Sequence, residues 1–389
     1  MLKFPKLFFQ SNPDADAFES HIRPSAEQRR YLRSCVTKIS DHLKPRITQV
    51  TKTVLGMDRS VIPRFRTQGS WSYDTCVVPA MTPPQEMDWD YGIYLPVTVW
   101  KANGPPHEMA KAYFDLVEKL LQDLCDKEKW ALLPGKDTCI RIQVASWAHV
   151  DVPLYAAPED EFEKITESVA VLKAHTYDSL GMESIDFAEG MQTRQQWADL
   201  KSVVMATRKG EWKPSDPQVV ANWFRDRVEE HGPQLRRVCR YLKAWRDHHW
   251  GQGGPTSVSI MIAVAQAFEP RDGRDDRAIE DSAKRMSRTF LGEIREPGID
   301  DGKEDFNRLQ DADRRATALR FGELAAQILQ ARESALHERE LVVDRLHRQF
   351  GERLPKDCMR VEIDSDPDAI RKTPASRVAV PVIPSTKAG

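Results

Sequence analysis

Strand-forming and helix-forming segments occupy different parts of this 389-residue chain, and that division limits the folds open to it. Between residues 62 and 155, short alternating runs rich in aromatic and β-branched residues predict strands, interrupted by one helical segment at 108–127. Beyond an irregular polar stretch, helical patterns follow at 218–230, 233–249, 257–268 and 315–350. Segregated strands and helices favour an α+β fold, with a mixed core followed by a helical domain.

The regions on either side of this pattern complete the expected organisation. Residues 25–54 are charged, periodic and poor in Gly and Pro, which predicts a long helix that braces the strands. We expect a core with this brace helix at 1–200, a helical domain at 201–363 and a flexible tail at 364–389. An apolar stripe at helical spacing is expected to be core packing: Phe321, Leu324, Ala325, Ile328 and Leu329.

Composition sets limits on the protein's class. With 40% hydrophobic and 30% charged residues, the chain can bury a core and is long enough for two domains. The formal net charge of -2 argues against a broad basic surface for long nucleic acids. The six cysteines form no CxxC pair, so neither a zinc site nor a disulfide framework is predicted and a reduced cytoplasm fits best. No stretch approaches the roughly 20 apolar residues of a membrane span, and the start lacks the apolar core of a signal peptide.

The clearest chemical signal is the pair Asp88 and Asp90, within a predicted strand at 85–96. Residues i and i+2 of a strand share a face, so the two carboxylates point to one spot. They can hold a hard cation together. Taken alone, an Asp-x-Asp pair on an exposed strand is more often merely solvated.

Two further features stand in sequence order around this pair. Gly69 and Ser70 form a predicted turn after a strand, and such a turn lets backbone N–H groups approach a phosphate. A Gly-Ser pair alone is usually an N-cap or an ordinary loop. Asp151, in a predicted strand at 149–155, adds a third carboxylate. Three aspartates without His or Cys suit magnesium.

Gly-Ser, then Asp-x-Asp, then a distant Asp is the order used by polymerase-β-type nucleotidyltransferases. Over most of its length the chain more closely resembles the bacterial cGAS/DncV-like nucleotidyltransferases (CD-NTases). The matching blocks are residues 67–75, 85–96, 149–162, 214–217, 238–247 and 253–259. The resemblance implies a polymerase-β-like nucleotidyltransferase core joined to a C-terminal helical domain of the OAS/cGAS type.

The resemblance also implies roles for individual residues. Asp88, Asp90 and Asp151 would be catalytic and would bind two Mg²⁺ ions, with Mn²⁺ as an alternative. Nucleotide contacts are implied for Gln68, Gly69, Ser70, Trp71, Ser72, Tyr73, Arg141, Ser215, Lys243, Ser257 and Asp301. Asp300 is adjacent to Asp301 and is an alternative for its role at a nucleobase edge. For Tyr73 the other interpretation is an aromatic that closes the turn.

Lys243 and Ser257 also have local interpretations. Lys243 lies in a predicted helix whose apolar residues face inward, so it can reach a triphosphate as a point charge, whereas an isolated lysine is usually a surface residue. Ser257 follows Pro255 and Thr256 at a predicted helix start. It can serve as an N-cap, as a phosphate ligand, or as both.

The function implied by the resemblance is synthesis of a cyclic dinucleotide from ATP and GTP, most simply 3',3'-cyclic GMP-AMP, as a second messenger in CBASS antiphage defence. A separate effector would respond to that messenger. The same aspartates also suit a transferase that adenylylates a small molecule, an RNA end or a protein. A catalytically silent nucleotide sensor is a third alternative.

The tail suggests one more partner. Residues 364–389 contain four prolines and end in Gly389. In the family, some cyclases are joined through their C-termini to targets by a protein with E1-like and E2-like parts. We therefore weigh conjugation through Gly389 against an ordinary disordered terminus.

Overall fold

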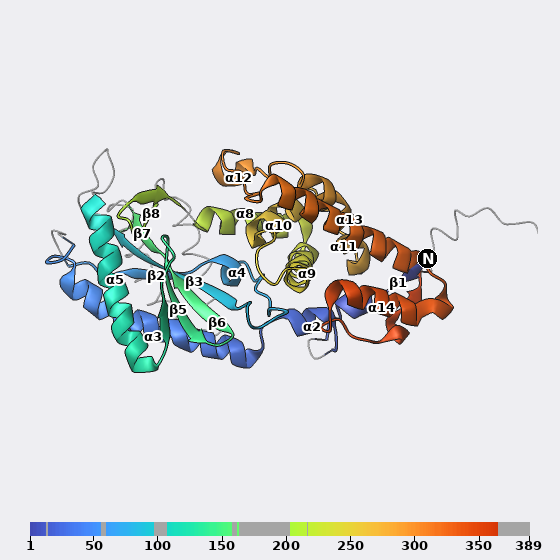
Figure 1. The fold of residues 1–389 in the computed structure, drawn as a ribbon, viewed down its shortest axis with the longest axis horizontal. Helices are drawn as coiled ribbons and strands as arrows, with labels where there is room; N and C mark the ends of the chain where they lie inside the picture. Colours follow the sequence, from blue (N-terminus) through green and yellow to red (C-terminus); the bar gives the residue numbers. More distant parts are fainter. Residues whose placement is uncertain are drawn as a thin grey trace, which may run out of the picture.

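The structure, a computed structural model, describes residues 1–12, 15–55, 60–96, 107–157, 162, 203–215 and 217–364. Two lobes lie side by side along the long axis of the molecule, one built on a mixed sheet and the other from helices (Figure 1). This arrangement confirms the predicted α+β fold class.

Strand β3, Met87–Pro96, forms the centre of the sheet. The strands in hydrogen-bonded order are β4 (Ala131–Leu133), β5 (Ile140–Ala145), β6 (Ala148–Val152), β3, β7 (Leu154–Ala157), β8 (Val204–Ala206) and β9 (Trp212–Pro214), with β2 (Arg64–Thr67) also paired to β3. Strands β6 and β7 both run parallel to β3, and β7 continues along β3 in the same register as β6. The remaining pairs in this sheet are antiparallel. The single strand predicted at 149–155 is interrupted at Pro153, because proline cannot donate to a ladder.

Two long helices, α3 (Ala26–Val50) and α5 (His107–Glu128), pack against each other and the sheet (Figure 1). Helix α3 begins with a capping box, in which the Ser25 hydroxyl accepts from the Gln28 N–H and the Gln28 side chain accepts from the Ser25 N–H. Its buried residues recur at helical spacing: Leu32, Cys35, Val36, Ile39, Leu43 and Ile47. A long helix was predicted at 25–54, and the structure has one at Ala26–Val50.

The second lobe is assembled around α9 (Pro233–His249). Its other helices are α8 (Pro217–His231), α10 (Ser257–Ala265), α11 (Asp275–Thr289), α12 (Pro297–Asp300), α13 (Asp311–Glu333) and α14 (Arg339–Phe350), with 3₁₀ turns η1 (Leu336–Glu338) and η2 (Cys358–Arg360). The predicted stripe on α13 is buried except for Leu329, which is 38% exposed because it is turned about 100° from Ile328 around the helix. No helix within the described ranges is long and apolar enough to cross a bilayer.

The N-terminal segment packs on the helical lobe. Strand β1 (Leu2–Lys3) pairs with β10 (Glu362–Ile363), and α1 (Pro5–Phe8) and α2 (Phe18–Ile22) follow it. Phe8 lies edge-on to Phe350 of α14, with ring centroids 5.1 Å apart. The prediction placed these residues with the sheet core, and the predicted boundary near residue 200 lies outside the described residues.

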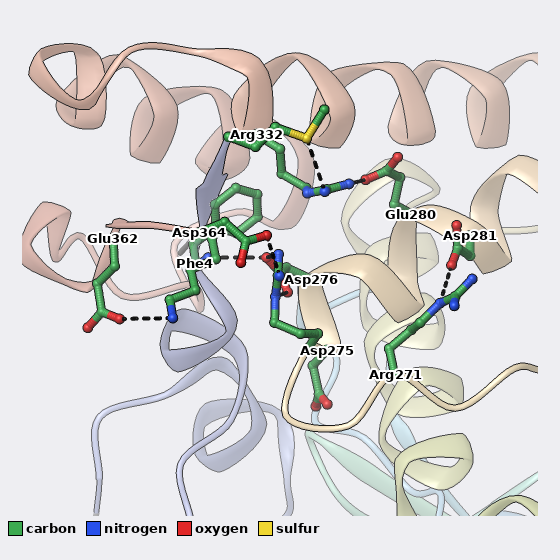
Figure 2. Close-up of polar contacts among 12 residues, drawn as sticks. Phe4, Arg271, Asp275, Asp276, Glu280, Asp281, Arg332, Glu362 and Asp364 are labelled. Atoms are coloured by element: carbon green, nitrogen blue, oxygen red, sulfur yellow. Dashed lines mark hydrogen bonds and ion pairs between the residues drawn. The ribbon is translucent and has the colours of Figure 1, made fainter. Parts of the chain in front are cut away.

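Polar contacts hold both ends of the described chain at the start of α11, as Figure 2 shows. The Phe4 backbone N–H donates to Asp276 Oδ2 at 3.2 Å. Arg274 bridges Asp276 and Asp364 at 2.9 and 2.5 Å. Both ends of the described chain are therefore fixed to the same helix.

Candidate active site

Three aspartates meet where β3 and β6 run in parallel. Asp90 and Asp151 are direct partners in the ladder between these strands. Asp88, two residues before Asp90, lies on the same face of β3. All three line one cavity, so the structure brings together the carboxylates predicted to act together.

Asp151 is 2% exposed and is surrounded by cationic groups. Arg141, its ladder partner on β5, donates to both carboxylate oxygens at 2.6 and 2.7 Å. Lys136, from the loop between β4 and β5, donates to Oδ2 at 2.6 Å. Burial alone would raise the pKa of the Asp151 carboxyl, but these hydrogen bonds outweigh it and hold the pKa below its usual range.

Asp90 has the opposite electrostatic environment. Burial, then the negative charges of Asp88 and Asp151, raise the pKa of the Asp90 carboxyl above its usual range. A bound cation would favour the ionised form of this carboxylate.

Asp88 lies beside His149, its ladder partner on β6. His149 Nε2 is 3.0 Å from Asp88 Oδ1, and His149 Nδ1 is 2.8 Å from Glu86 Oε2. The Asp88 contact is an ion pair without aligned hydrogen-bond geometry. Burial would lower the pKa of His149, but the Asp88 carboxylate outweighs it and raises the pKa. The metal site was predicted to contain no histidine, but His149 directly contacts Asp88.

The predicted turn forms a short helix, α4 (Gly69–Ser72), directly after β2. Gly69 has φ +59°, a left-handed conformation that favours glycine. Trp71 Nε1 donates to the Asp88 carbonyl at 3.0 Å, and the Ser72 hydroxyl donates to the Gly69 carbonyl at 2.9 Å. Trp71 therefore holds the turn against β3, and Ser72 closes the turn on itself.

Gln68 precedes the turn and is buried against two tyrosines. Its amide donates to Tyr94 Oη at 2.6 Å and accepts from Tyr155 Oη at 3.2 Å. Its backbone N–H donates to the Asp90 carbonyl at 2.8 Å. These contacts fix the start of the turn relative to the aspartates.

The helical lobe contributes Lys243, which is 3% exposed on α9. Its ammonium group donates to the Thr75 carbonyl at 2.5 Å, just after the turn. Burial lowers the pKa of Lys243 to about 8. This lysine is therefore not the ordinary surface residue that its residue type would suggest.

Ser257 is the first residue of α10 and does not cap it. The N-cap is Thr256, whose hydroxyl accepts from the Ser259 N–H at 3.1 Å. The Ser257 hydroxyl instead accepts from Arg246 at 3.1 Å. The N-cap interpretation of Ser257 was wrong, because the helix begins at Ser257, one residue earlier than that interpretation requires.

A cavity of about 730 Å³ lies between the lobes. Of the predicted residues it is lined by Gln68, Gly69, Ser70, Tyr73, Asp88, Asp90, Asp151, Ser215, Lys243 and Ser257. Trp71, Ser72 and Arg141 lie behind this lining and contact it. A cavity of this size, with polar groups from both lobes, is typical of a small-molecule site.

Asp301 is not among the residues that line the cavity. Its side chain is 85% exposed and pairs with Lys303 at 3.3 Å, at the end of α12. Asp300 accepts from the Gly302 backbone N–H at 3.1 Å. From the same connection between α12 and α13, Arg308 does line the cavity.

Several residues at the site were missed by sequence reasoning. Lys136 comes from a loop with no recognisable motif. Arg246 follows Lys243 on α9 and lines the same cavity. Gln85 joins the lobes by donating to the Asp247 and Trp250 carbonyls, both at 2.7 Å. His149 had a usable signal, because it is two residues before Asp151 on the same strand face.

The donor set suits a hard divalent cation. Asp88, His149 and Asp151 each offer an atom, and these atoms lie within 4.8 Å of one another. Asp88 Oδ1 is buried without an aligned hydrogen bond among the described residues. Carboxylate oxygens are the ligands that such cations prefer, so the residues fit a divalent metal.

Three aspartates beside a glycine-serine turn, on a mixed sheet that faces a helical lobe, define a nucleotidyltransferase. The family model described as "Cyclic GMP-AMP synthase DncV-like, nucleotidyltransferase domain" matches residues 63–155. A second, "Cyclic GMP-AMP synthase, C-terminal domain", matches residues 232–362. The chain belongs to the DncV-like nucleotidyltransferase family, as the sequence blocks indicated.

Individual relatives agree with this assignment. The cyclic GMP-AMP synthase of Vibrio cholerae serotype O1 is 32% identical over 324 residues, which cover 79% of this chain and 72% of that protein. A crystal structure of Vibrio cholerae DncV has a TM-score of 0.73 at 23% identity and covers 93% of this chain and 99% of its own. A structure of a DncV variant with ATP and GTP has a TM-score of 0.71 at 25% identity, covering 92% and 98%.

Proposed function

We propose that this chain is a cyclic dinucleotide synthase that joins ATP and GTP to 3',3'-cyclic GMP-AMP and releases pyrophosphate. The observation that carries the proposal is the shared cavity, in which three aspartates of the sheet lobe face Lys243 and Ser257 of the helical lobe. Similarity to cyclic GMP-AMP synthases, including a relative solved with ATP and GTP, supports the choice of substrates.

The three aspartates supply the carboxylates that would hold the metal ions. Nucleotidyl transfer requires in-line attack of a ribose hydroxyl on an α-phosphate. Asp88, Asp90 and Asp151 would hold two Mg²⁺ ions, with Mn²⁺ as an alternative. Such ions, when bound, stabilise the entering and leaving oxygens and lower the pKa of the attacking hydroxyl.

The phosphate-binding groups come from both lobes. Gly69 and Ser70 present the α4 turn beside Asp90, while Lys243 and Ser257 lie on the wall formed by the helical lobe. Cations and backbone N–H groups are the donors that phosphates prefer. Closing such a site around a triphosphate would orient its α-phosphate toward the aspartates. Ser215, at the lobe junction, is proposed to add a further contact.

The biological part of the proposal rests on the family resemblance. The product would be a cytoplasmic second messenger in CBASS antiphage defence that activates a separate effector. An E1/E2-like partner that acts on Gly389 is part of the same proposal, and Gly389 lies outside the described residues.

The test is incubation of the full-length protein with the four ribonucleoside triphosphates and Mg²⁺, followed by separation of products by chromatography and mass. Omitting one triphosphate at a time identifies the bases. We expect a mixed guanine-adenine product that requires both ATP and GTP. A product in which AMP is attached to an added small molecule, RNA end or protein would instead favour the adenylyl-transfer alternative.

A further inference from the structure

Asp88 has a line of polar residues behind it that the proposed chemistry does not use. His149 is its ladder partner on β6, and Gln143 is the ladder partner of His149 on β5. Glu86 lies two residues before Asp88, on the same side of the chain. These residues therefore form a row across three strands, beside the row that holds Asp90 and Asp151.

The contacts in this row are continuous. Gln143 Nε2 donates to Glu86 Oε1 at 2.7 Å. Glu86 Oε2 is 2.8 Å from His149 Nδ1, and His149 Nε2 is 3.0 Å from Asp88 Oδ1. Both oxygens of Glu86 and both ring nitrogens of His149 thus have a neighbour.

Burial prevents His149 from turning freely. The residue is 6% exposed, so a ring rotation that broke the Glu86 contact would leave a polar nitrogen buried without a partner. The Asp88 side chain is 44% exposed and faces the cavity. A fixed ring therefore stands against a carboxylate that would otherwise be free to change rotamer.

We propose that Glu86 and His149, supported by Gln143, are positioning residues that hold the Asp88 carboxylate in its cation-binding orientation. The inference rests on the proposed role of Asp88 as a ligand of the divalent ion. In this arrangement His149 acts on the ion through Asp88, because its Nε2 faces the Asp88 carboxylate and its Nδ1 faces Glu86. Outer partners of this kind commonly matter about 10- to 100-fold in metal affinity.

The experiment measures binding of Mn²⁺ to the full-length protein from the EPR signal of free Mn²⁺, so it does not depend on product formation. Glu86→Gln keeps the size of the side chain and removes its charge, and His149→Gln removes the ring. We expect each to weaken Mn²⁺ binding by about 10- to 100-fold. The double variant should bind as weakly as His149→Gln alone, because Glu86 acts through His149.

Glu128→Gln is the matched control, because it removes one carboxylate of similar exposure, 19% against 20%, from an ion pair with Lys38 on α3. It should leave Mn²⁺ affinity unchanged. Thermal melts of all variants identify any loss of folding, and the isosteric Glu86→Gln keeps the test valid if His149→Gln is unstable.

Three results would overturn the inference: unchanged Mn²⁺ affinity in folded Glu86→Gln, additive losses in the double variant, or ¹⁴N coupling from an imidazole to Mn²⁺ in pulsed EPR. The last would make His149 a direct ligand. Asp88→Asn distinguishes a failure of the positioning inference from a failure of the proposed cation-binding role of Asp88. If that variant also binds Mn²⁺ normally, the proposed cation role of Asp88 fails together with the inference built on it.

Discussion

Gly69 lies so close to Asp90 that a Cβ at position 69 would come within 2.0 Å of Asp90 Oδ2. The same glycine has φ +59°, and the residue before it, Gln68, donates its backbone N–H to the Asp90 carbonyl at 2.8 Å. The α4 turn and strand β3 can thus lie this close together only because residue 69 has no side chain. Any larger residue at position 69 must move a carboxylate that the proposed chemistry needs.

Gly69→Ala should therefore abolish most dinucleotide synthesis while the protein stays folded. The left-handed backbone costs about 1–2 kcal/mol of stability for a residue with a Cβ. Gly273→Ala is the control, because its φ is +62° and its Cβ would meet no atom within 4 Å. It should show the same backbone cost with normal synthesis. Normal synthesis by Gly69→Ala would mean that Asp90 can move without consequence.

Asp90→Asn should stabilise the protein at alkaline pH when divalent ions are chelated. A raised carboxyl pKa contributes stability that is fully present below the unfolded pKa, about 3.9, and is lost as the pH rises through the folded pKa. Melting curves in EDTA should coincide near pH 4 and favour the Asn variant near pH 9. Asp115→Asn, from an exposed pair with Lys111, should change either melt little. A variant less stable at pH 9 would contradict the crowding of these carboxylates.

Lys243→Ala should weaken triphosphate binding by roughly 1.5–3 kcal/mol if the ammonium makes one charge-assisted hydrogen bond. Because burial lowers the pKa of Lys243 to about 8, nucleotide affinity of the parent should fall as the pH rises through 8. The variant should lack that step. Equilibrium binding of both nucleotides across pH 6–9 measures it, with exposed Lys209→Ala as control. Unchanged affinity in Lys243→Ala would remove the residue from the site.

Asp88→Asn combined with Asp90→Asn should abolish both product and pyrophosphate release while leaving the fold intact. Removing two crowded negative charges relieves repulsion, so melting temperature should not fall. Pyrophosphate release and thermal melts on the same preparation give both readouts. Robust synthesis by the double variant would be incompatible with the proposed role of the aspartates.

Local sequence patterns were enough to predict those features of the fold that depend on residues close together in the chain. Strand alternation placed Asp88 and Asp90 on one face, and the Ser25 to Gln28 capping box marks the start of α3. The family blocks then added the order of the lobes, which the structure and the family models confirm.

Contacts between distant segments left no such signal. The register that places Asp151 beside Asp90 is set by strand pairing, and Lys136 reaches Asp151 from an irregular loop. The N-terminal segment looked like an extension of the core, yet Phe8 packs on Phe350 more than 300 residues later. Periodicity describes which face of an element is apolar, and it does not state which neighbour covers that face.

The most direct test of the account is the chemical form of the product made by the pure protein from ATP, GTP and Mg²⁺. We expect a compound with the mass of cyclic GMP-AMP that resists phosphatase because it has no terminal phosphate. This compound should be absent when Asp88→Asn is combined with Asp90→Asn. A phosphatase-sensitive linear dinucleotide as the sole end product, or no joined nucleotides under these conditions, would contradict it.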